Sequence, residues 1–175
     1  MSLNTRLLES INIVVGTPPA DFNSDQNGDY VSLKGYDGCL VVVTKAAGTA
    51  GDDFVLKLTQ ATAVAGTSDK ALNINHVYAK VGTQTGVSTF TKYSGTAASS
   101  VDTVSAFGTD LAADSVEALF VIDVRANDLD VDNGFDCIRY VHEGDDVGNS
   151  TYATVHYILY GARYPQPSPI AAITD

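Results

Sequence analysis

Residues 117–144 read EALFVIDVRANDLDVDNGFDCIRYVHEG, and this stretch decides the predicted fold. Two apolar runs, 117–125 and 135–144, have the composition of β-strands, because they are rich in β-branched and aromatic residues. Between them, Asn133-Gly134 is a strong short-range hairpin signal, since both residues tolerate a positive φ angle. The stretch therefore predicts two antiparallel strands joined by a polar connection.

The same connection raises the question of a calcium site. Asp128, Asp130 and Asp132 alternate as the first ligands of an EF-hand loop do, but that loop also needs glycine at position 6 and a bidentate glutamate at position 12. Those positions hold Asn133 and Arg139 here, so the motif fails at its two most discriminating places. We expect an ordinary polar connection and no metal, with the three aspartates as the candidate ligands of a weak calcium site outside the EF-hand class.

Short apolar runs, separated by Gly, Asn and Asp, continue along the chain and predict an all-β fold. We expect an antiparallel β-sandwich or jelly roll. The expected strands are 30–34, 39–45, 54–60, 71–81, 89–93, 101–107, 118–125, 135–142 and 152–162. Several of these runs are apolar on both faces, so one side should pack on the second sheet and the other on a further surface, such as another subunit.

All five prolines lie near the ends of the chain, at positions 18, 19, 165, 167 and 169. Because proline is excluded from interior ladder positions, we expect one β domain over residues 20–164, an N-terminal arm over 1–19 and a proline-rich C-terminal arm over 165–175. Neither arm is expected to pair with the central sheet. Asn4 could cap a short helix in the N-terminal arm. The candidate partner contacts are the apolar residues of the arms: Leu3, Leu7, Leu8, Ile11, Ile170 and Ile173.

The charge of the chain argues against several partners. The formal net charge is −11, and residues 110–146 hold eleven acidic residues against two arginines, a local balance of −9. Basic residues are scattered singly, so we expect no nucleic-acid binding. Residues 1–16 carry charges at Arg6 and Glu9, and no apolar run of about 18 residues occurs, so we expect neither a signal peptide nor membrane association.

Catalytic and cofactor motifs are absent from the sequence. His76, His142 and His156 lie in strand-like runs and are interpreted as structural residues. Cys137 together with His142 or His156 would be the one imaginable nucleophile pair. We expect no enzymatic activity and no cofactor.

The two cysteines, Cys39 and Cys137, each lie inside an apolar run, which favours buried free thiols. For Cys137, burial and the acidic neighbours Asp136 and Asp123 should raise the thiol pKa and oppose formation of the nucleophilic thiolate.

A family resemblance rests on four phrases: GDYVSLKGYDGCLVVVTKAAGTAGDDFVLKLTQATAVAGTSDKAL, TFTKY, ALFVIDVRANDLDVDNGFDCIRY and YILYGARYPQP. They resemble small virion structural proteins of tailed bacteriophages, most of all capsid decoration (cement) proteins, over roughly residues 16–167. The resemblance implies a non-enzymatic β-sandwich that binds the major capsid protein on the surface of the assembled shell, as a homo-oligomer on the particle. It also implies synthesis in the cytoplasm of a bacterial host, which suits free thiols.

Two alternatives remain. One is a tail, neck or fibre component of the virion, which would assemble in rings or trimers. The other is a carbohydrate-binding β-sandwich module, with tyrosines as stacking platforms. The candidate platforms are Tyr78, Tyr93, Tyr140, Tyr152 and Tyr160.

Overall fold

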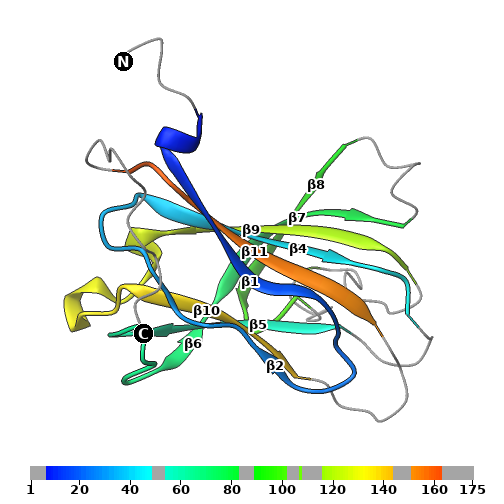
Figure 1. Cartoon of the computed structure of the whole chain (residues 1–175), viewed down its shortest axis with the longest axis horizontal. Coiled ribbons are helices and arrows are strands. Elements are labelled where there is room, and N and C mark those ends of the chain that lie inside the picture. Colours follow the sequence, from blue (N-terminus) through cyan, green and yellow to red (C-terminus); the bar gives the residue numbers. More distant parts are fainter. Residues whose placement is uncertain are drawn as a thin grey trace.

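The computed structural model describes residues 7–48, 54–82, 89–101, 107, 116–143 and 151–162. These residues form two antiparallel sheets packed face to face, with β11, β4 and β9 above β10 and β5 in the view of Figure 1. The expectation of an all-β antiparallel sandwich is confirmed.

The larger sheet has six strands in the order β1-β11-β4-β9-β7-β8, and each neighbouring pair is antiparallel. Their bounds are β1 (Ile11–Asp21), β11 (Tyr152–Tyr160), β4 (Gly38–Lys45), β9 (Ala118–Arg125), β7 (Ile74–Val81) and β8 (Thr91–Ala98). The bounds of β4, β9 and β11 agree with the predicted strands 39–45, 118–125 and 152–162 to within two residues at each end.

The smaller sheet has the order β2-β10-β5-β6, with β3 also paired to β10. Its strands are β2 (Gln26–Asn27), β3 (Val31–Ser32), β10 (Cys137–Glu143), β5 (Val55–Ala61) and β6 (Lys70–Leu72). Three short 3₁₀ turns complete the described elements: η1 (Leu7–Glu9), η2 (Ala126–Asp128) and η3 (Val131–Asn133).

Successive segments of the chain alternate between the two sheets. The path runs from β1 to β2 and β3, back to β4, across to β5 and β6, back to β7, β8 and β9, across to β10, and finally to β11. This connectivity places β11 between β1 and β4, and β10 between β2 and β5, which is the arrangement of a jelly roll.

The core lies between the sheets because the strands alternate in burial with a period of two. In β9, Ala118, Phe120, Ile122 and Val124 are buried, whereas the residues between them are partly exposed. β4 and β11 follow the same pattern. The largest fully buried side chains include Tyr140 and Tyr157.

The predicted hairpin at Asn133-Gly134 is wrong. β9 belongs to the six-stranded sheet and β10 to the smaller one, so residues 126–136 cross from one layer to the other. Gly134 does have a positive φ of 83°, but Asn133 closes the 3₁₀ turn η3 instead of sharing a two-residue hairpin turn. A crossing, unlike a hairpin, places β10 between β2 and β5, where its buried residues pack into the core.

Other strand predictions need correction. The stretch 71–81 is two strands, β6 and β7, which belong to different sheets and are separated at Asn73. The predicted strand 101–107 is not supported at its first residue, since Val101 lies in a turn; residues 102–106 lie outside the described part. β8 extends to Ala98, beyond the predicted 89–93.

The N-terminal segment pairs with the sheet, contrary to expectation, and the predicted boundary after residue 19 falls inside β1. β1 contains Pro18 and Pro19 and pairs with β11 from Ile11↔Tyr160 to Asp21↔Tyr152. The prolines lie between the paired residues Thr17 and Ala20, where the register shifts. Such a bulge, in a strand at the edge of the described sheet, accommodates residues that cannot donate to a ladder.

The predicted N-terminal helix is at most one 3₁₀ turn in the described residues, because η1 covers Leu7–Glu9 and Ile11 already lies in β1. Leu7 and Leu8 are 70% and 66% exposed. Asn4 and Leu3, together with Ile170 and Ile173 of the C-terminal arm, lie outside the described residues.

Candidate functional site

The three aspartates of the β9–β10 crossing do not converge. Asp128 accepts a hydrogen bond from the backbone N–H of Arg125 at 2.9 Å. The carboxylate of Asp130 is ion-paired with Lys70 of β6 and accepts a bond from the Asn133 side-chain amide. Each of these two carboxylates therefore stabilises its own part of the crossing.

Asp130 ties the crossing to the smaller sheet. In addition to its carboxylate contacts, its backbone N–H donates to the side-chain oxygen of Gln60 in β5 at 2.9 Å. The hydrogen bond from Lys70, and then that from Asn133, holds the pKa of Asp130 below its ordinary value. Within the described parts of the chain, no group of three His, Cys, Asp or Glu side chains is placed to hold a metal ion.

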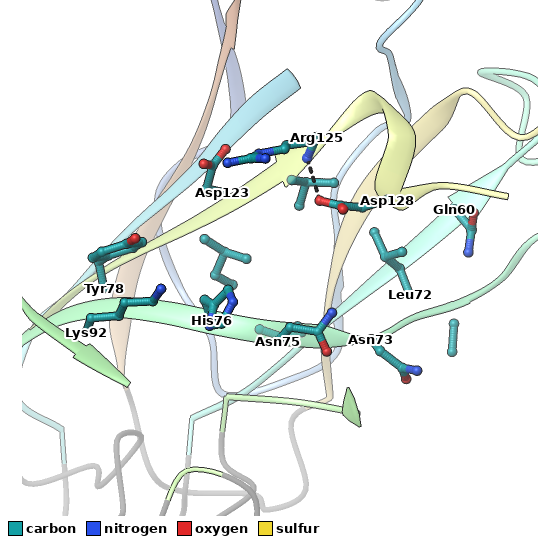
Figure 2. A pocket seen from close by; sticks show the side chains of 14 residues that line it. Gln60, Leu72, Asn73, Asn75, His76, Tyr78, Lys92, Asp123, Arg125 and Asp128 are labelled. Carbon is teal, nitrogen blue, oxygen red and sulfur yellow. Dashed lines mark hydrogen bonds between the residues drawn. The ribbon is translucent and has the colours of Figure 1, made fainter. Parts of the chain in front are cut away.

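A groove opens where β7 and β9 diverge. The two strands pair from Val81↔Ala118 to Tyr78↔Val121, but β9 continues to pair with β4 as far as Gly38↔Arg125. Beyond Tyr78 the strands separate, and a hollow of about 510 Å³ lies between them (Figure 2). We call it the β7–β9 groove.

The groove combines an apolar floor with a polar lining. The buried core residues Ile74, Ile122 and Val124 form the floor. In Figure 2, His76 and Lys92 lie on the opposite side of the groove from Asp123 and Arg125. The polar lining residues are Gln60, Asn73, Asn75, His76, Tyr78, Lys92, Asp123, Arg125 and Asp128.

A second hollow, of about 530 Å³, lies on the other side of Asp123 and Arg125. It is lined by these two residues together with Asp37, Leu40 and Tyr160. The Tyr160 hydroxyl donates to Asp123 at 2.6 Å, and burial first, then this carboxylate, raises the pKa of Tyr160. Asp123 and Arg125 therefore form a ridge between two hollows.

The five candidate tyrosines do not form one platform. Tyr78 lines the β7–β9 groove and Tyr160 the neighbouring hollow. Tyr140 is fully buried, Tyr93 packs against the core, and Tyr152 is 59% exposed on β11. Tyr78 and Tyr160 are thus the candidates that a ligand of the two hollows could reach.

The histidines have separate surroundings. The Nδ1 atom of His76 lies 3.2 Å from the Ser94 hydroxyl, at the groove. His142 is buried, and its two ring nitrogens lie 2.9 Å from the carbonyl oxygens of Val55 and Phe22. His142 is therefore engaged with the backbone, away from the Cys137 thiol, which donates to Asp136.

Both thiols are buried and free, as predicted. Burial raises the pKa of Cys39 far above its ordinary value. Burial and then the hydrogen bond to Asp136 raise the pKa of Cys137 to about 12. Asp123 acts on Cys39 and is not among the causes for Cys137, so the expected direction is confirmed but one of the two expected neighbours is not.

The outer face of the six-stranded sheet, which points away from the core, carries an apolar region on β1, β11, β4 and β9. Ile13, Ile158 and Leu40 are direct neighbours on β1, β11 and β4. Val15 and Val42 lie in the next row on either side of His156, and Val121 of β9 is opposite Val42. The prediction that several strands are apolar on both faces is confirmed. We call this set the apolar face: Ile13, Val15, Leu40, Val42, Leu119, Val121 and Ile158.

Comparisons with protein-family models, with curated proteins and with solved structures found no match. The fold and the hollows by themselves describe this chain as an antiparallel jelly-roll protein with an apolar sheet face and a polar groove. In the described residues, no helix is long and apolar enough to cross a membrane.

Sequence reasoning missed both surface features in part. The apolar face could be found from the two-sided runs CLVVV and ALFVIDV, but not the contribution of Ile13 and Val15, which were assigned to an arm. The groove residues Asn73, Asn75 and Arg125 carry no spacing signal, because the groove exists only where β7 leaves β9.

Proposed function

We propose that this chain is a non-enzymatic structural protein of a tailed-bacteriophage particle, which binds the major capsid protein on the surface of the assembled shell and stabilises it. The observation that carries the proposal is the apolar face of the six-stranded sheet. The jelly roll supports it at the level of architecture, since that fold is frequent among viral capsid domains, although a fold alone does not imply a function.

The apolar face is too large a set of apolar side chains to be explained as scattered surface residues. It spans four adjacent strands, and Ile13 and Val15 at its edge are 49% and 54% exposed. Contiguous exposed apolar patches of this kind mark protein interaction sites. A standard interface buries about 1,600 Å² in total, which a six-stranded sheet face can supply in large part.

A decoration protein stabilises a shell by mass action. It binds the assembled shell and not free subunits, so its binding free energy adds to the stability of the shell. Many symmetry-related copies multiply a modest contribution from each. The exposed Leu7 and Leu8 next to β1 would extend the contact toward a neighbouring shell subunit or a second copy of this chain.

The charge distribution suits a particle surface. The chain carries −11 overall, whereas the seven residues of the apolar face carry no charge. Its charged neighbours Asp123 and Arg125 lie at one edge, next to Leu40 and Gly38, so burying the centre of the face avoids the cost of desolvating a charge, and acidic residues elsewhere would keep particles apart in solution.

The test uses purified phage heads that lack this chain, to which the purified full-length protein is added. We expect saturable binding at a copy number that scales with the shell subunits, and a higher temperature of head disruption. Copies per particle are measured by quantitative mass spectrometry. A handful of copies located on the tail or neck would favour the tail, neck or fibre alternative, and absence of binding would overturn the proposal.

A matched pair of variants tests the face itself. Val15→Asp places a charge on the apolar face, whereas Val131→Asp places the same charge on η3, at a residue of similar exposure, 55% against 54%. Because an unpaired charge is costly to bury, Val15→Asp should weaken head binding at least about tenfold and Val131→Asp should not. Equal binding by both variants would show that this face is not the contact.

A further inference from the structure

The β7–β9 groove lies beside the apolar face and is different in chemistry. Val121 of β9 is paired with Tyr78 of β7, and Tyr78 is paired with Lys92 of β8, so the outer face continues through these residues. There the apolar residues end and the groove begins, lined by amide, imidazole, guanidinium and carboxylate groups. A surface that only packs on a protein shell has no need of such a hollow.

The amide groups of the groove offer hydrogen-bond donors and acceptors together. Asn73 and Asn75 are exposed on the approach to β7 and on β7 itself, and each carboxamide has two donor hydrogens and an acceptor oxygen. Gln60 lines the inner end of the groove, where its oxygen already accepts the Asp130 backbone N–H, which orients its NH₂ group. A hydroxyl group can both donate and accept a hydrogen bond at one atom, so this lining suits hydroxyl-rich molecules.

The charges in the groove are balanced. Lys92 and Arg125 contribute two positive charges, and Asp123 and Asp128 two negative charges. In a chain with a net charge of −11, this balance is a local feature, and it gives neither an anion nor a cation a net attraction. The groove therefore favours an uncharged polar ligand.

Tyr78 supplies a flat surface at the groove. Its ring is partly exposed, and the ammonium of the exposed Lys92 lies over it, 5.8 Å from the ring centroid, so a ligand that stacks on this ring would take the place of the lysine. Sugar rings present one face of C–H bonds that can pack on an aromatic ring while their hydroxyl groups reach polar neighbours. An amphipathic aromatic surface beside convergent polar groups is a common feature of ligand sites.

We infer that the β7–β9 groove binds an uncharged saccharide, with the ring of Tyr78 as its stacking surface and Asn73, Asn75 and Arg125 as hydrogen-bonding groups. The volume of about 510 Å³ lies within the range of small-molecule sites, about 300–1,000 Å³. The inference goes beyond the proposed structural function and is independent of it, because the groove residues are not those of the apolar face.

The first experiment applies the full-length protein to an array of neutral oligosaccharides, with carboxylated and sulfated glycans on the same array. We expect binding to one or more neutral glycans, and titration calorimetry with the best of them then gives the dissociation constant. Failure to bind any neutral glycan at millimolar concentration would overturn the inference. Binding restricted to acidic glycans would also overturn it, because the charge argument would be wrong.

Matched variants then locate the site. Asn75→Ala should weaken binding of that glycan about three- to tenfold through lost hydrogen bonds, whereas Asn27→Ala, at an exposed residue of β2, should not. Tyr78→Leu should weaken binding by about tenfold, and Tyr152→Leu, at an exposed tyrosine outside the groove, should not. Thermal melting checks that each variant is folded. Unchanged binding by both groove variants would place the saccharide elsewhere and refute the assignment.

Discussion

The backbone N–H of Tyr140 donates a hydrogen bond to the hydroxyl oxygen of Tyr157 at 2.9 Å, in the centre of the core. Tyr140 belongs to β10 of the smaller sheet and Tyr157 to β11 of the larger one, so this bond joins the two layers. Tyr140 lies between the residues of β10 that pair with β3, 137–138, and those that pair with β2, 141–142. A side chain of one sheet thus satisfies a backbone donor of the other.

Tyr157→Phe should therefore destabilise the fold. The change leaves the buried N–H of Tyr140 without this acceptor, which costs about 1–3 kcal/mol of the free energy of unfolding. Urea denaturation measures the loss. Tyr152→Phe, at a 59% exposed tyrosine of the same strand, is the control and should change stability by less than about 0.5 kcal/mol. Equal effects of the two changes would show that the bond between the layers contributes nothing.

Chelation should leave the protein unaffected. The carboxylate of Asp130 already has Lys70 and Asn133 as partners, so the crossing is held by the protein's own groups. We expect the same melting temperature with a chelator and with millimolar calcium. Because a ligand that binds the native state raises its stability, a rise of several degrees in calcium that Asp130→Asn abolishes would show that the aspartates of this crossing form a metal site.

Acid should release the Asp130 contact. Its pKa in the folded protein lies below the ordinary value of 3.8, so the contact stabilises the fold above about pH 4 and is lost as the pH falls through the folded-state pKa. Asp130→Asn should lower the melting temperature slightly at pH 7, and the difference from the wild type should shrink toward pH 3.

Asp132→Asn is the control for this pH experiment, because it removes a charge from the same turn and leaves the Asp130–Lys70 contact in place. Differential scanning calorimetry at several pH values follows all three proteins. A constant difference between Asp130→Asn and the wild type over the whole range would contradict the link to this carboxylate.

The two thiols should differ in their tolerance of serine. Cys39 lies fully buried in the main core, so Cys39→Ser should cost about 1–3 kcal/mol because a hydroxyl is buried there; Cys39→Ala should cost less. The Cys137 thiol donates to Asp136 at 3.1 Å, and a serine hydroxyl can replace that donor. Chemical denaturation of Cys39→Ser, Cys39→Ala, Cys137→Ser and Cys137→Ala measures the loss of stability in each variant. A loss for Cys137→Ser as large as that for Cys39→Ser would refute the expected difference.

Truncation should separate the N-terminal turn from β1. Deletion of residues 1–10 removes η1 and leaves β1 complete, so the shortened chain should remain folded with a similar melting temperature. Deletion of residues 1–21 removes β1, exposes β11 along its length and takes Thr17 away from Tyr140, so it should destabilise the fold strongly. Circular dichroism melts report both results; unfolding of the shorter deletion would show that residues 1–10 complete the core.

The strands of the sandwich were largely open to prediction because alternation is a local property of the chain. Runs such as CLVVV and ALFVIDV form β4 and β9, with the buried and outward residues that a period of two requires. The burial of Cys39 and Cys137 follows from the same patterns. Composition and charge were equally accessible, since they need no coordinates.

What the tertiary structure alone decided is which strand each segment pairs with. Asn133-Gly134 has the local signal of a hairpin, yet β9 and β10 lie in different sheets, because β10 packs between β2, β3 and β5. Likewise, β1 pairs with β11 in spite of its prolines, because an edge strand with a bulge tolerates them. Contacts such as Ile13 with Ile158 join residues far apart in the chain, and local patterns do not specify them.

The groove belongs to this second category. Asn75 and Arg125 are separated by fifty positions in the sequence and line one hollow only because β7 leaves β9 after the Tyr78–Val121 pair. The residue types were visible in the sequence, but a site needs them on the same side of a gap. Where two strands part depends on the packing of both sheets, and that is settled by the whole fold.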